Sequence, residues 1–408
     1  MANIMKRIYC ILIRSVGAKN VLRLGALATL IPHVAFGLGS RIPNQDAEAT
    51  ARGNAFVATA DNPSAIYYNP AGIIQIQGTE AQLGMHAITI DSHFEPVAGR
   101  SWDTKFEIQG APQLYSVYSP SNKPYAFGIG MYAPFGLGVQ WPGDASLRNQ
   151  GIESRLMYVT LSPVVAWQIV PGLTIAAGPT IDFAQLKLRK GVGLVNGDTF
   201  RFTGDGWTFG AKAGLLWQPH EKVSLGVSYF SPTTVDFEGG SSIKPEFTGT
   251  HPTKASVEFP QFIMGGISFR PTPDWNFEVG ADWTDWDVLN TVTFEGTPAG
   301  NAPFPLNWKS SWMINAGVTR YLDNHYWVAA GYFYSENSTT DRDFSPLIPD
   351  TDLHVGSIGF GRRGERWSWA VSGQIISGPA RHISNGNSAD GSYRFFNQAV
   401  NISVAYRF

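Results

Sequence analysis

The chain has 408 residues, with 30 Lys and Arg, 32 Asp and Glu, 44 glycines and 13% aromatic residues. Residues 1–35 hold five of the basic residues and no acidic one, so their removal leaves 25 basic against 32 acidic residues. That acidic balance gives no basic patch, and we expect no nucleic-acid partner. The only cysteine is Cys10. A disulfide scaffold, a thiolate metal site and a cysteine nucleophile are therefore excluded from the exported chain.

The N-terminus has the pattern of a secretory signal. Five basic residues are followed from Leu24 by the apolar run LGALATLIPHVAFG, with small residues at Ala35 and Gly37. The alternative is a single-pass anchor, but Pro32 interrupts a run that is already short for a helix of about 20 residues. We expect residues 1–36 to be a signal peptide that is cleaved near Ala35 or Gly37.

The stretch DNPSAIYYNPAG (61–72) combines two features that rarely occur together. Two Asn-Pro pairs, at 62–63 and 69–70, disfavour a helix interior or a central strand. Ile66, Tyr67 and Tyr68 between them are nevertheless the apolar and aromatic residues of a buried segment. We expect an irregular segment that is buried by something other than itself, because the residues between 37 and 78 are too few for a core of their own.

From residue 79 to the end, alternating and aromatic-rich segments are separated by Gly, Pro, Asn and Asp. No later stretch has the 18 consecutive apolar residues of a transmembrane helix. The pattern predicts fourteen strands, at 79–94, 104–118, 125–133, 152–170, 172–189, 205–218, 222–238, 254–270, 275–295, 307–322, 326–336, 352–362, 366–377 and 394–408. Every second connection is tight, and the others are longer. This alternation is typical of an antiparallel outer-membrane β-barrel.

Side-chain alternation supports a membrane location. In the ninth segment, Trp275, Phe277, Val279, Ala281 and Trp283 are apolar, whereas the residues between them are polar or small. Such a row with aromatic ends matches the lipid-facing band of a barrel strand. The last strand has an apolar face that ends on Phe408, which resembles the C-terminal signal of outer-membrane proteins. We therefore predict an all-β, 14-stranded antiparallel transmembrane barrel over residues 79–408, with outer-membrane lipid and the insertion machinery as partners.

A fourteen-stranded barrel encloses a lumen wider than side chains alone can fill. Irregular backbone is permitted at membrane depth where protein surrounds it. The sequence thus predicts that residues 37–78 form an N-terminal hatch, a plug inside the lumen.

The chain resembles the FadL-type family of outer-membrane transporters for long-chain fatty acids and other hydrophobic compounds. The resemblance rests on ARGNAFVATADNPSAIYYNPAG (51–72), whose Asn69-Pro70-Ala71-Gly72 matches the family's hatch motif, and on the order of signal, hatch, fourteen strands and terminal Phe. It implies passive uptake, with capture outside, a pocket in the lumen and lateral exit beside a kinked third strand. Pro134 and Gly136 are the residues expected to kink that strand.

The resemblance also suggests candidates for the pocket lining: Tyr67, Tyr68, Lys309 and Met313. Met313 stands where relatives place a basic residue facing the lumen, and a carboxylate ligand needs a cation. The loops 190–204 and 239–253 are short and rich in Gly and Ser, unlike the longer capture loops of fatty-acid transporters. The sequence therefore does not distinguish among fatty acids, alkanes, aromatic hydrocarbons and terpenoids as cargo.

Catalytic and metal chemistry have little support in the sequence. Asp282, Asp285 and Asp287 alternate between strand faces, which disfavours a shared cation. The histidines form no metal-binding motif, and no Ser-His pairing follows for His354 or His382. We expect no enzyme activity, no cofactor and no metal.

The predicted function is passive uptake of hydrophobic small molecules by a monomer in the bacterial outer membrane, through lateral diffusion across the barrel wall. The alternative is a general diffusion porin for polar solutes with a displaceable plug. A structural or adhesion barrel without transport is a third hypothesis.

Overall fold

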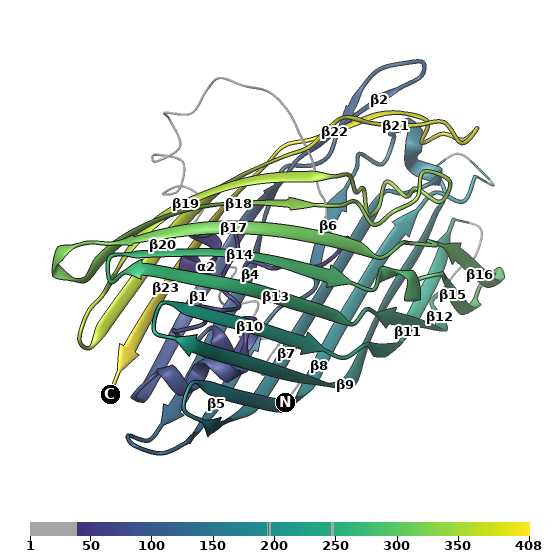
Figure 1. The fold of residues 1–408 in the computed structure, drawn as a ribbon. Coiled ribbons are helices and arrows are strands. Elements are labelled where there is room, and N and C mark those ends of the chain that lie inside the picture. Colours follow the sequence, from purple (N-terminus) through teal and green to yellow (C-terminus); the bar gives the residue numbers. More distant parts are fainter. Residues whose placement is uncertain (1–38, 194, 196, 246–248) are drawn as a thin grey trace.

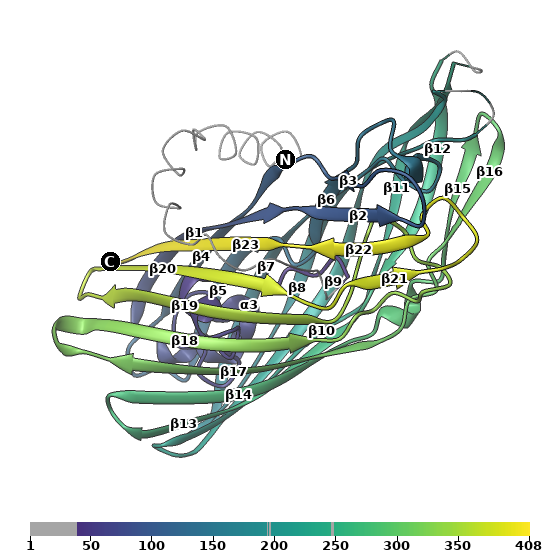
Figure 2. The same ribbon diagram turned by 90° about the horizontal axis from the view of Figure 1, so that it is seen from above.

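The computed structural model describes residues 39–408 except 194, 196 and 246–248. The predicted signal peptide and its cleavage position lie outside the described residues. The described chain forms a closed antiparallel barrel, which encircles a short helical segment (Figures 1 and 2). None of the described helices is long and apolar enough to cross a membrane.

Fourteen spans build the barrel wall, and several of them are interrupted. Nine are single strands: β1 (Gly78–Ile90), β4 (Glu107–Ser119), β7 (Glu153–Val170), β8 (Leu173–Lys190), β9 (Thr199–His220), β18 (Tyr326–Ser335), β19 (Leu353–Arg363), β20 (Trp367–Ser377) and β23 (Asn397–Arg407). Five are pairs of strands: β5 (Tyr125–Tyr132) with β6 (Gly136–Gln140), β10 (Val223–Phe230) with β11 (Thr233–Lys244), β12 (His251–Phe259) with β13 (Phe262–Thr272), β14 (Trp275–Thr284) with β15 (Thr291–Thr297), and β16 (Gly300–Pro305) with β17 (Ser311–Tyr321).

The first and last strands close the barrel. β1 pairs with β23 over a register that runs from Glu80 opposite Arg407 to Ile88 opposite Ala399. All wall ladders are antiparallel, and the six connections predicted to be tight are the short ones at one rim. The prediction of a fourteen-stranded antiparallel barrel is confirmed.

The two faces of the wall differ as the alternation predicts. In β14, Phe277 and Val279 are exposed on the outside, whereas Asn276 and Glu278 are buried inside. In β23, Val400, Ile402 and Val404 are likewise exposed. Exposed apolar residues on a barrel exterior are the surface that lipid covers.

Three predicted strands are too short. β9 begins at Thr199, six residues earlier than predicted, and β11 and β12 extend to Lys244 and from His251. Phe200 and Phe202 alternate with outward residues and pack inside, so the strand continues through a stretch whose glycines suggested a loop. The loop before β9 and the loop between β11 and β12 are consequently even shorter than the predicted loops at 190–204 and 239–253.

Five spans are interrupted in the extracellular half of the wall. The breaks at 133–135, 231–232 and 260–261 each contain a proline, which cannot donate to a ladder. The break at 285–290 contains a single 3-10 turn, η4 (Trp286–Val288), and residues 306–310 form the fifth. Here the wall departs from a regular sheet, and this is the level of the cavity described below.

A small second sheet covers one side of the extracellular end. It consists of β2 (Ser92–Pro96), β3 (Trp102–Asp103), β21 (Arg381–Ile383) and β22 (Gly391–Phe395). Phe94 and Tyr393 stack at 4.6 Å and pack against Trp141 in an apolar cluster. The sequence predicts only a long connection between the strands at 366–377 and 394–408, because β21 and β22 are too short to show an alternation.

Residues 39–77, here called the N-terminal segment, lie inside the barrel. They contain α2 (Ala47–Ala51), α3 (Ala65–Tyr68) and the 3-10 helix η2 (Pro70–Gln75). Both views show these elements, in purple, surrounded by wall strands (Figures 1 and 2). The last short elements are η3 (Ser146–Asn149) and η5 (Asp323–His325), in an extracellular loop and a tight turn.

Candidate functional site

An apolar cavity of about 120 Å³ lies in the lumen at the level of the interrupted strands. Its walls come from β6–β8, β11, β12, η4 and the stretch around Trp308. Leu156, Leu186, Phe259, Phe294 and Trp286 are among the lining residues. None of the described lining residues is basic. The cavity therefore suits a hydrophobic molecule and offers no cation for a carboxylate.

Phe135 joins the cavity to the break in the third span. Its ring lies 5.9 Å from that of Trp286, 5.2 Å from Phe259 and 5.3 Å from Tyr158. It is 4% exposed, although it sits where β5 ends and β6 begins. The backbone break thus carries a side chain that packs into the centre of the aromatic core.

The third span is interrupted between β5 and β6: Pro134 lies in the break at 133–135, and Gly136 is the first residue of β6. β5 pairs with β4 only from Leu114 opposite Met131 to Tyr118 opposite Phe127. β6 pairs with β7, and in the described residues no ladder joins it to β4. The upper part of β4 is therefore separated from β6, and the wall has a gap in its hydrogen-bonded ladder.

A few polar contacts cross this gap near its extracellular end. The Gln109 side chain donates to the Gly138 carbonyl at 2.7 Å, and the Lys105 amide donates to the Gln140 carbonyl at 2.8 Å. These contacts leave the middle of the gap, between Ala111 and the kink, to be filled by other residues.

The start of the N-terminal segment fills the gap from inside. Ile42 donates its amide to the Pro134 carbonyl at 2.8 Å, and Gly136 donates to the Ser40 carbonyl at 2.9 Å. The Ile42 side chain packs with Ala111 of β4 and Ala133 of the kink, and all three are buried. Residues 40–42 thus take the place beside the kink that a regular β4–β6 ladder would occupy.

Arg41 anchors this start to the opposite wall. Its guanidinium donates to Asp282 and to Thr284, each at 3.0 Å, and lies 4.1 Å from the centre of the Phe262 ring. Both charged side chains are almost completely buried. Asp282, one of three acidic residues weighed as a cation site, is thus an ion-pair partner. The described residues contain no cluster that could hold a metal.

The predicted hatch motif contacts both the N-terminal segment and the wall. The Asn69 amide donates to the carbonyls of Val57 and Leu215, each at 2.9 Å, and its side-chain oxygen accepts from the Ala71 amide. Pro70 is the first residue of η2, where a missing donor costs nothing. A Cβ on Gly72 would collide with the Ala60 backbone, so only glycine fits there.

Tyr67 and Tyr68 are buried below the cavity and do not line it. Their rings lie 5.0 Å apart, and Tyr67 also contacts Tyr132 at 5.2 Å. The Tyr68 hydroxyl donates to the Pro43 carbonyl at 2.8 Å. Lys212 of β9 donates to the Ile66 and Tyr67 carbonyls at the end of α3. The two tyrosines thus lie at the contact between the N-terminal segment and the wall.

The other two candidate lining residues also lie away from the cavity. Lys309 has an exposed side chain within the break at 306–310. Met313 is 1% exposed and packs in the extracellular cluster with Phe333 and Leu353. The structure therefore brings none of Tyr67, Tyr68, Lys309 and Met313 into the lining of the cavity.

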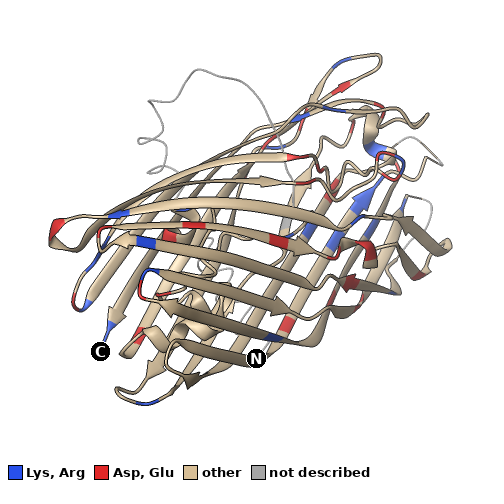
Figure 3. Ribbon diagram, viewed as in Figure 1, with Lys and Arg blue, Asp and Glu red and all other residues tan. Residues whose placement is uncertain are grey.

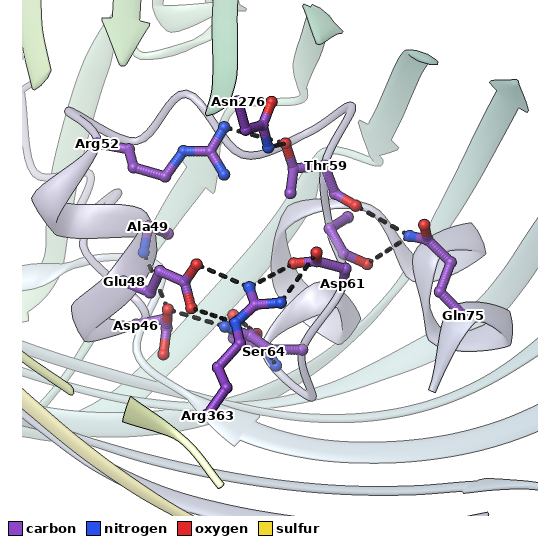
Figure 4. Close-up of polar contacts among 12 residues, drawn as sticks. Asp46, Glu48, Ala49, Arg52, Thr59, Asp61, Ser64, Gln75, Asn276 and Arg363 are labelled. Atoms are coloured by element: carbon purple, nitrogen blue, oxygen red, sulfur yellow. Dashed lines mark hydrogen bonds and ion pairs between the residues drawn. The ribbon is translucent and has the colours of Figure 1, made fainter. Parts of the chain in front are cut away.

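A charged network attaches the N-terminal segment to the periplasmic rim (Figure 4). Arg363 of β19 lies between two carboxylates, with its Nη2 atom 2.7 Å from Glu48 and 2.8 Å from Asp61. Arg270 of β13 reaches Asp61 from another side at 3.1 Å. Asp46 caps α2 by accepting from the Ala49 amide at 2.9 Å.

A second attachment lies deeper in the lumen. Glu278 of β14 accepts from the amides of Ala58 and Thr59 at 2.8 and 2.9 Å, and from the Thr59 hydroxyl. Asn276 donates to the same hydroxyl at 2.9 Å. One wall carboxylate therefore satisfies two backbone donors of a segment that has no sheet of its own.

The network also shifts the titration of Asp61. Burial alone would raise the pKa of this carboxyl, but the charges of Arg363 and Arg270 outweigh burial and hold the pKa well below its usual value. Asp61 is therefore ionised at any physiological pH, and its ion pairs persist.

Sequence reasoning missed Phe135, Arg41, Glu278 and Arg363. The sequence holds only an indirect signal for the charged residues of the wall. Asp46, Glu48, Arg52 and Asp61 are four charges in a segment predicted to be buried, and buried charges need partners. Which wall residues supply those partners depends on the register of strands more than 200 positions away, which the sequence alone does not fix.

Comparisons with known proteins agree with this architecture. The profile of the family described as "Outer membrane protein transport protein (OMPP1/FadL/TodX)" matches residues 28–368. Outer membrane protein P1 of Haemophilus influenzae is 22% identical over 359 residues, covering 74% of this chain and 77% of that protein. A long-chain fatty acid transport protein of Escherichia coli is 21% identical over 367 residues and 78% of each chain.

Solved structures share the fold. A FadL homologue of Pseudomonas aeruginosa superposes with a TM-score of 0.80 at 18% identity, covering 91% of this chain and all of that one. The toluene transporter TodX of P. putida gives 0.72 at 18% identity, covering 91% and 99%. The chain therefore belongs to the OMPP1/FadL/TodX family of outer-membrane transport proteins, and the outer membrane is its location.

Proposed function

We propose that this protein takes up uncharged hydrophobic small molecules through the cavity and releases them sideways through the gap between β4 and β6. The observation that carries the proposal is an apolar cavity, without a basic lining residue, next to a wall gap filled by Ile42. An apolar solute that left through water would expose its surface again, at a cost of about 25 cal/mol for each Å². A lateral exit into the membrane avoids that cost.

Among the cargoes left open, the cavity favours hydrocarbons over fatty acids. Relatives include proteins named for long-chain fatty acids and for toluene. Membership of the family therefore does not decide between fatty acids and hydrocarbons as cargo. Burying a carboxylate without a partner is expensive, and the nearest predicted cation, Lys309, is exposed outside the lining. An alkane or an aromatic hydrocarbon needs only the apolar lining.

In this proposal the N-terminal segment acts as the hatch predicted for residues 37–78, leaving residues 79–408 as the barrel. The segment is held by wall residues on three separate strands, namely Arg363, Glu278 and Leu215. Such a plug closes the straight path to the periplasm. The proposed transport is passive and involves no enzyme activity or cofactor. We also propose that one barrel suffices for transport, so that the protein is a monomer.

The proposal is tested with the purified protein in liposomes and in cells that lack other hydrocarbon channels. We expect labelled toluene or octane to enter cells faster than in a strain without the protein, and oleate uptake to change little. A larger gain for oleate than for the hydrocarbons would contradict the assignment of uncharged cargo.

The porin alternative has a separate readout. A plugged barrel predicts slow swelling of liposomes in small sugars, whereas an open porin predicts rapid swelling. Rapid entry of sugars through the intact protein would overturn the hatch, independently of which hydrophobic molecule is transported.

A further inference from the structure

Four basic residues share one patch on the outer face of the barrel, near the extracellular ends of β7, β8 and β9. They are Arg155, Lys187, Arg189 and Arg201. Successive strand residues point to opposite faces. The chain neighbours of the four point into the lumen, namely Leu156, Leu186, Leu188, Phe200 and Phe202. Figure 3 shows Lys and Arg gathered along these strands.

The register places these cations directly opposite one another. Arg155 is the cross-strand partner of Lys187, and Arg189 is the partner of Arg201. Lys187 and Arg189 are also two residues apart on the same strand face. Like charges directly opposite each other destabilise a sheet. Two such pairs in adjacent rows are therefore unfavourable unless an anion lies among them.

The protein neutralises only part of this charge. Arg155 pairs with Glu107 at 2.6 Å, and Arg189 pairs with Glu153 at 3.4 Å. Lys187 and Arg201 are exposed, and in the described part of the chain neither has an ion pair. Two positive charges of the patch thus face outward without a carboxylate.

The patch lies just above the aromatic boundary of the lipid band. Two rows below Arg155 and Lys187, Phe183 is the cross-strand partner of Trp207, and their rings are 5.0 Å apart. Four strand residues at a tilt near 40° rise about 10 Å. Aromatic girdles mark the membrane interface, so the cations lie at the level of outer-leaflet headgroups.

We propose that this patch binds the phosphorylated saccharide headgroup of an outer-leaflet glycolipid. Phosphates accept several charge-assisted hydrogen bonds from guanidinium and ammonium groups. A headgroup with two phosphates also offsets both like-charge pairs. Its acyl chains would lie along the apolar surface below, where Trp207 and Phe209 are exposed. A soluble phosphate anion has the same recognition chemistry but would gain nothing from that surface.

The test uses the purified full chain in detergent and counts bound lipid by native mass spectrometry. The double variant Lys187→Gln/Arg201→Gln removes the two unpaired cations. The matched control, Lys123→Gln/Lys222→Gln, removes two exposed cations near the opposite rim. Heat-modified mobility on gels verifies that each barrel is folded.

We expect the wild type and the control to bind bisphosphorylated lipid A about tenfold more tightly than the double variant does, a difference of about 1.4 kcal/mol. Dephosphorylated lipid A should bind all three proteins equally weakly. Equal affinity of the double variant and the wild type for the bisphosphorylated lipid would overturn the site. Competition by millimolar inorganic pyrophosphate as strong as that by the lipid would overturn the assignment to a lipid.

Discussion

Asn69 makes three hydrogen bonds that connect η2, the loop at Val57 and the wall strand β9. We predict that Asn69→Ala loosens the N-terminal segment, because buried backbone carbonyls lose their donor at a cost of about 1–3 kcal/mol. The barrel ladders do not depend on this side chain. Single-channel recording should show raised conductance, while heat-modified gel mobility stays that of a folded barrel. Unchanged conductance would contradict this role and would mean that the Asn69-Pro70 motif only forms a turn.

Asp61 makes the seating of the N-terminal segment depend on pH. Its pKa is lowered in the folded protein, so the ionised carboxylate stabilises the seated segment above the unfolded pKa near 3.9, and that stabilisation is lost as the pH falls toward the folded value. We predict conductance that is constant from about pH 5 to 8 and rises only in stronger acid. Asp61→Asn should raise conductance already at neutral pH. A variant indistinguishable from the wild type at pH 7 would contradict this role.

At the scale of single residues, the sequence predicts a residue's role where that role depends on its neighbours in the chain. The Asn-Pro pairs identified Asn69 because a proline and its neighbour restrict their own backbone. Arg363 gave no such signal. An arginine before a tight turn looks like any rim residue, and its two carboxylate partners are 302 and 315 positions away.

At the scale of elements, the break between β5 and β6 is the feature on which lateral exit depends. We predict that Pro134→Val/Gly136→Val favours a continuous third strand, since both substitutions restore β-forming residues and the first restores a donor. Hydrocarbon uptake should fall several-fold while the amount of folded barrel is unchanged. The matched variant Pro232→Val changes the break between β10 and β11, away from the gap, and should transport normally.

The ends of strands could be predicted where apolar and polar residues alternate strongly. The predicted ends were wrong where glycine is frequent, as at the ends of β9, β11 and β12. For the third strand, the sequence predicts a kink at Pro134 and Gly136, and in the structure residues 133–135 separate β5 from β6. It gave no indication that residues 40–42 pair with the kink. That contact joins stretches about 90 positions apart through only two backbone hydrogen bonds.

At the scale of the whole molecule, the wall is shaped to receive the N-terminal segment. A Cβ added to Gly214, Gly226, Gly317 or Gly331 would lie under 3.0 Å from atoms of that segment. These glycines come from four different strands. The wall therefore approaches the segment closely at positions where no side chain intervenes.

This close approach predicts that substitutions of two glycines, Gly331 and Gly373, have different effects on the N-terminal segment. Gly331→Val should displace the segment at Arg52 and Gly53, because the new side chain collides with their backbone. Gly373→Val, on β20, adds a side chain where nothing lies within 4 Å. We expect raised conductance and protease sensitivity of the segment for the first variant, and wild-type behaviour for the second. Equal conductance of the two variants would contradict the fit.

The barrel itself was the most predictable part. Fourteen segments of alternating residues, and short connections that alternate with long ones, all indicate the same architecture. The cavity was not predictable, since it is built from side chains on many separate elements. The candidates chosen by resemblance, Lys309 and Met313, lie elsewhere because the breaks at 285–290 and 306–310 bring Trp286 and Trp308 to the lining.

The lateral gap is tested most directly by closing it reversibly. Residues 39–408 contain no cysteine, so Ala111→Cys/Ala133→Cys introduces two thiols there, one on either side of Ile42. The control pair Ala126→Cys/Ala166→Cys joins cross-strand partners of an intact ladder. A short, reducible thiol cross-linker should abolish toluene uptake in the first protein, reductant should restore it, and the control should transport throughout. Undiminished uptake through the cross-linked gap would contradict lateral release.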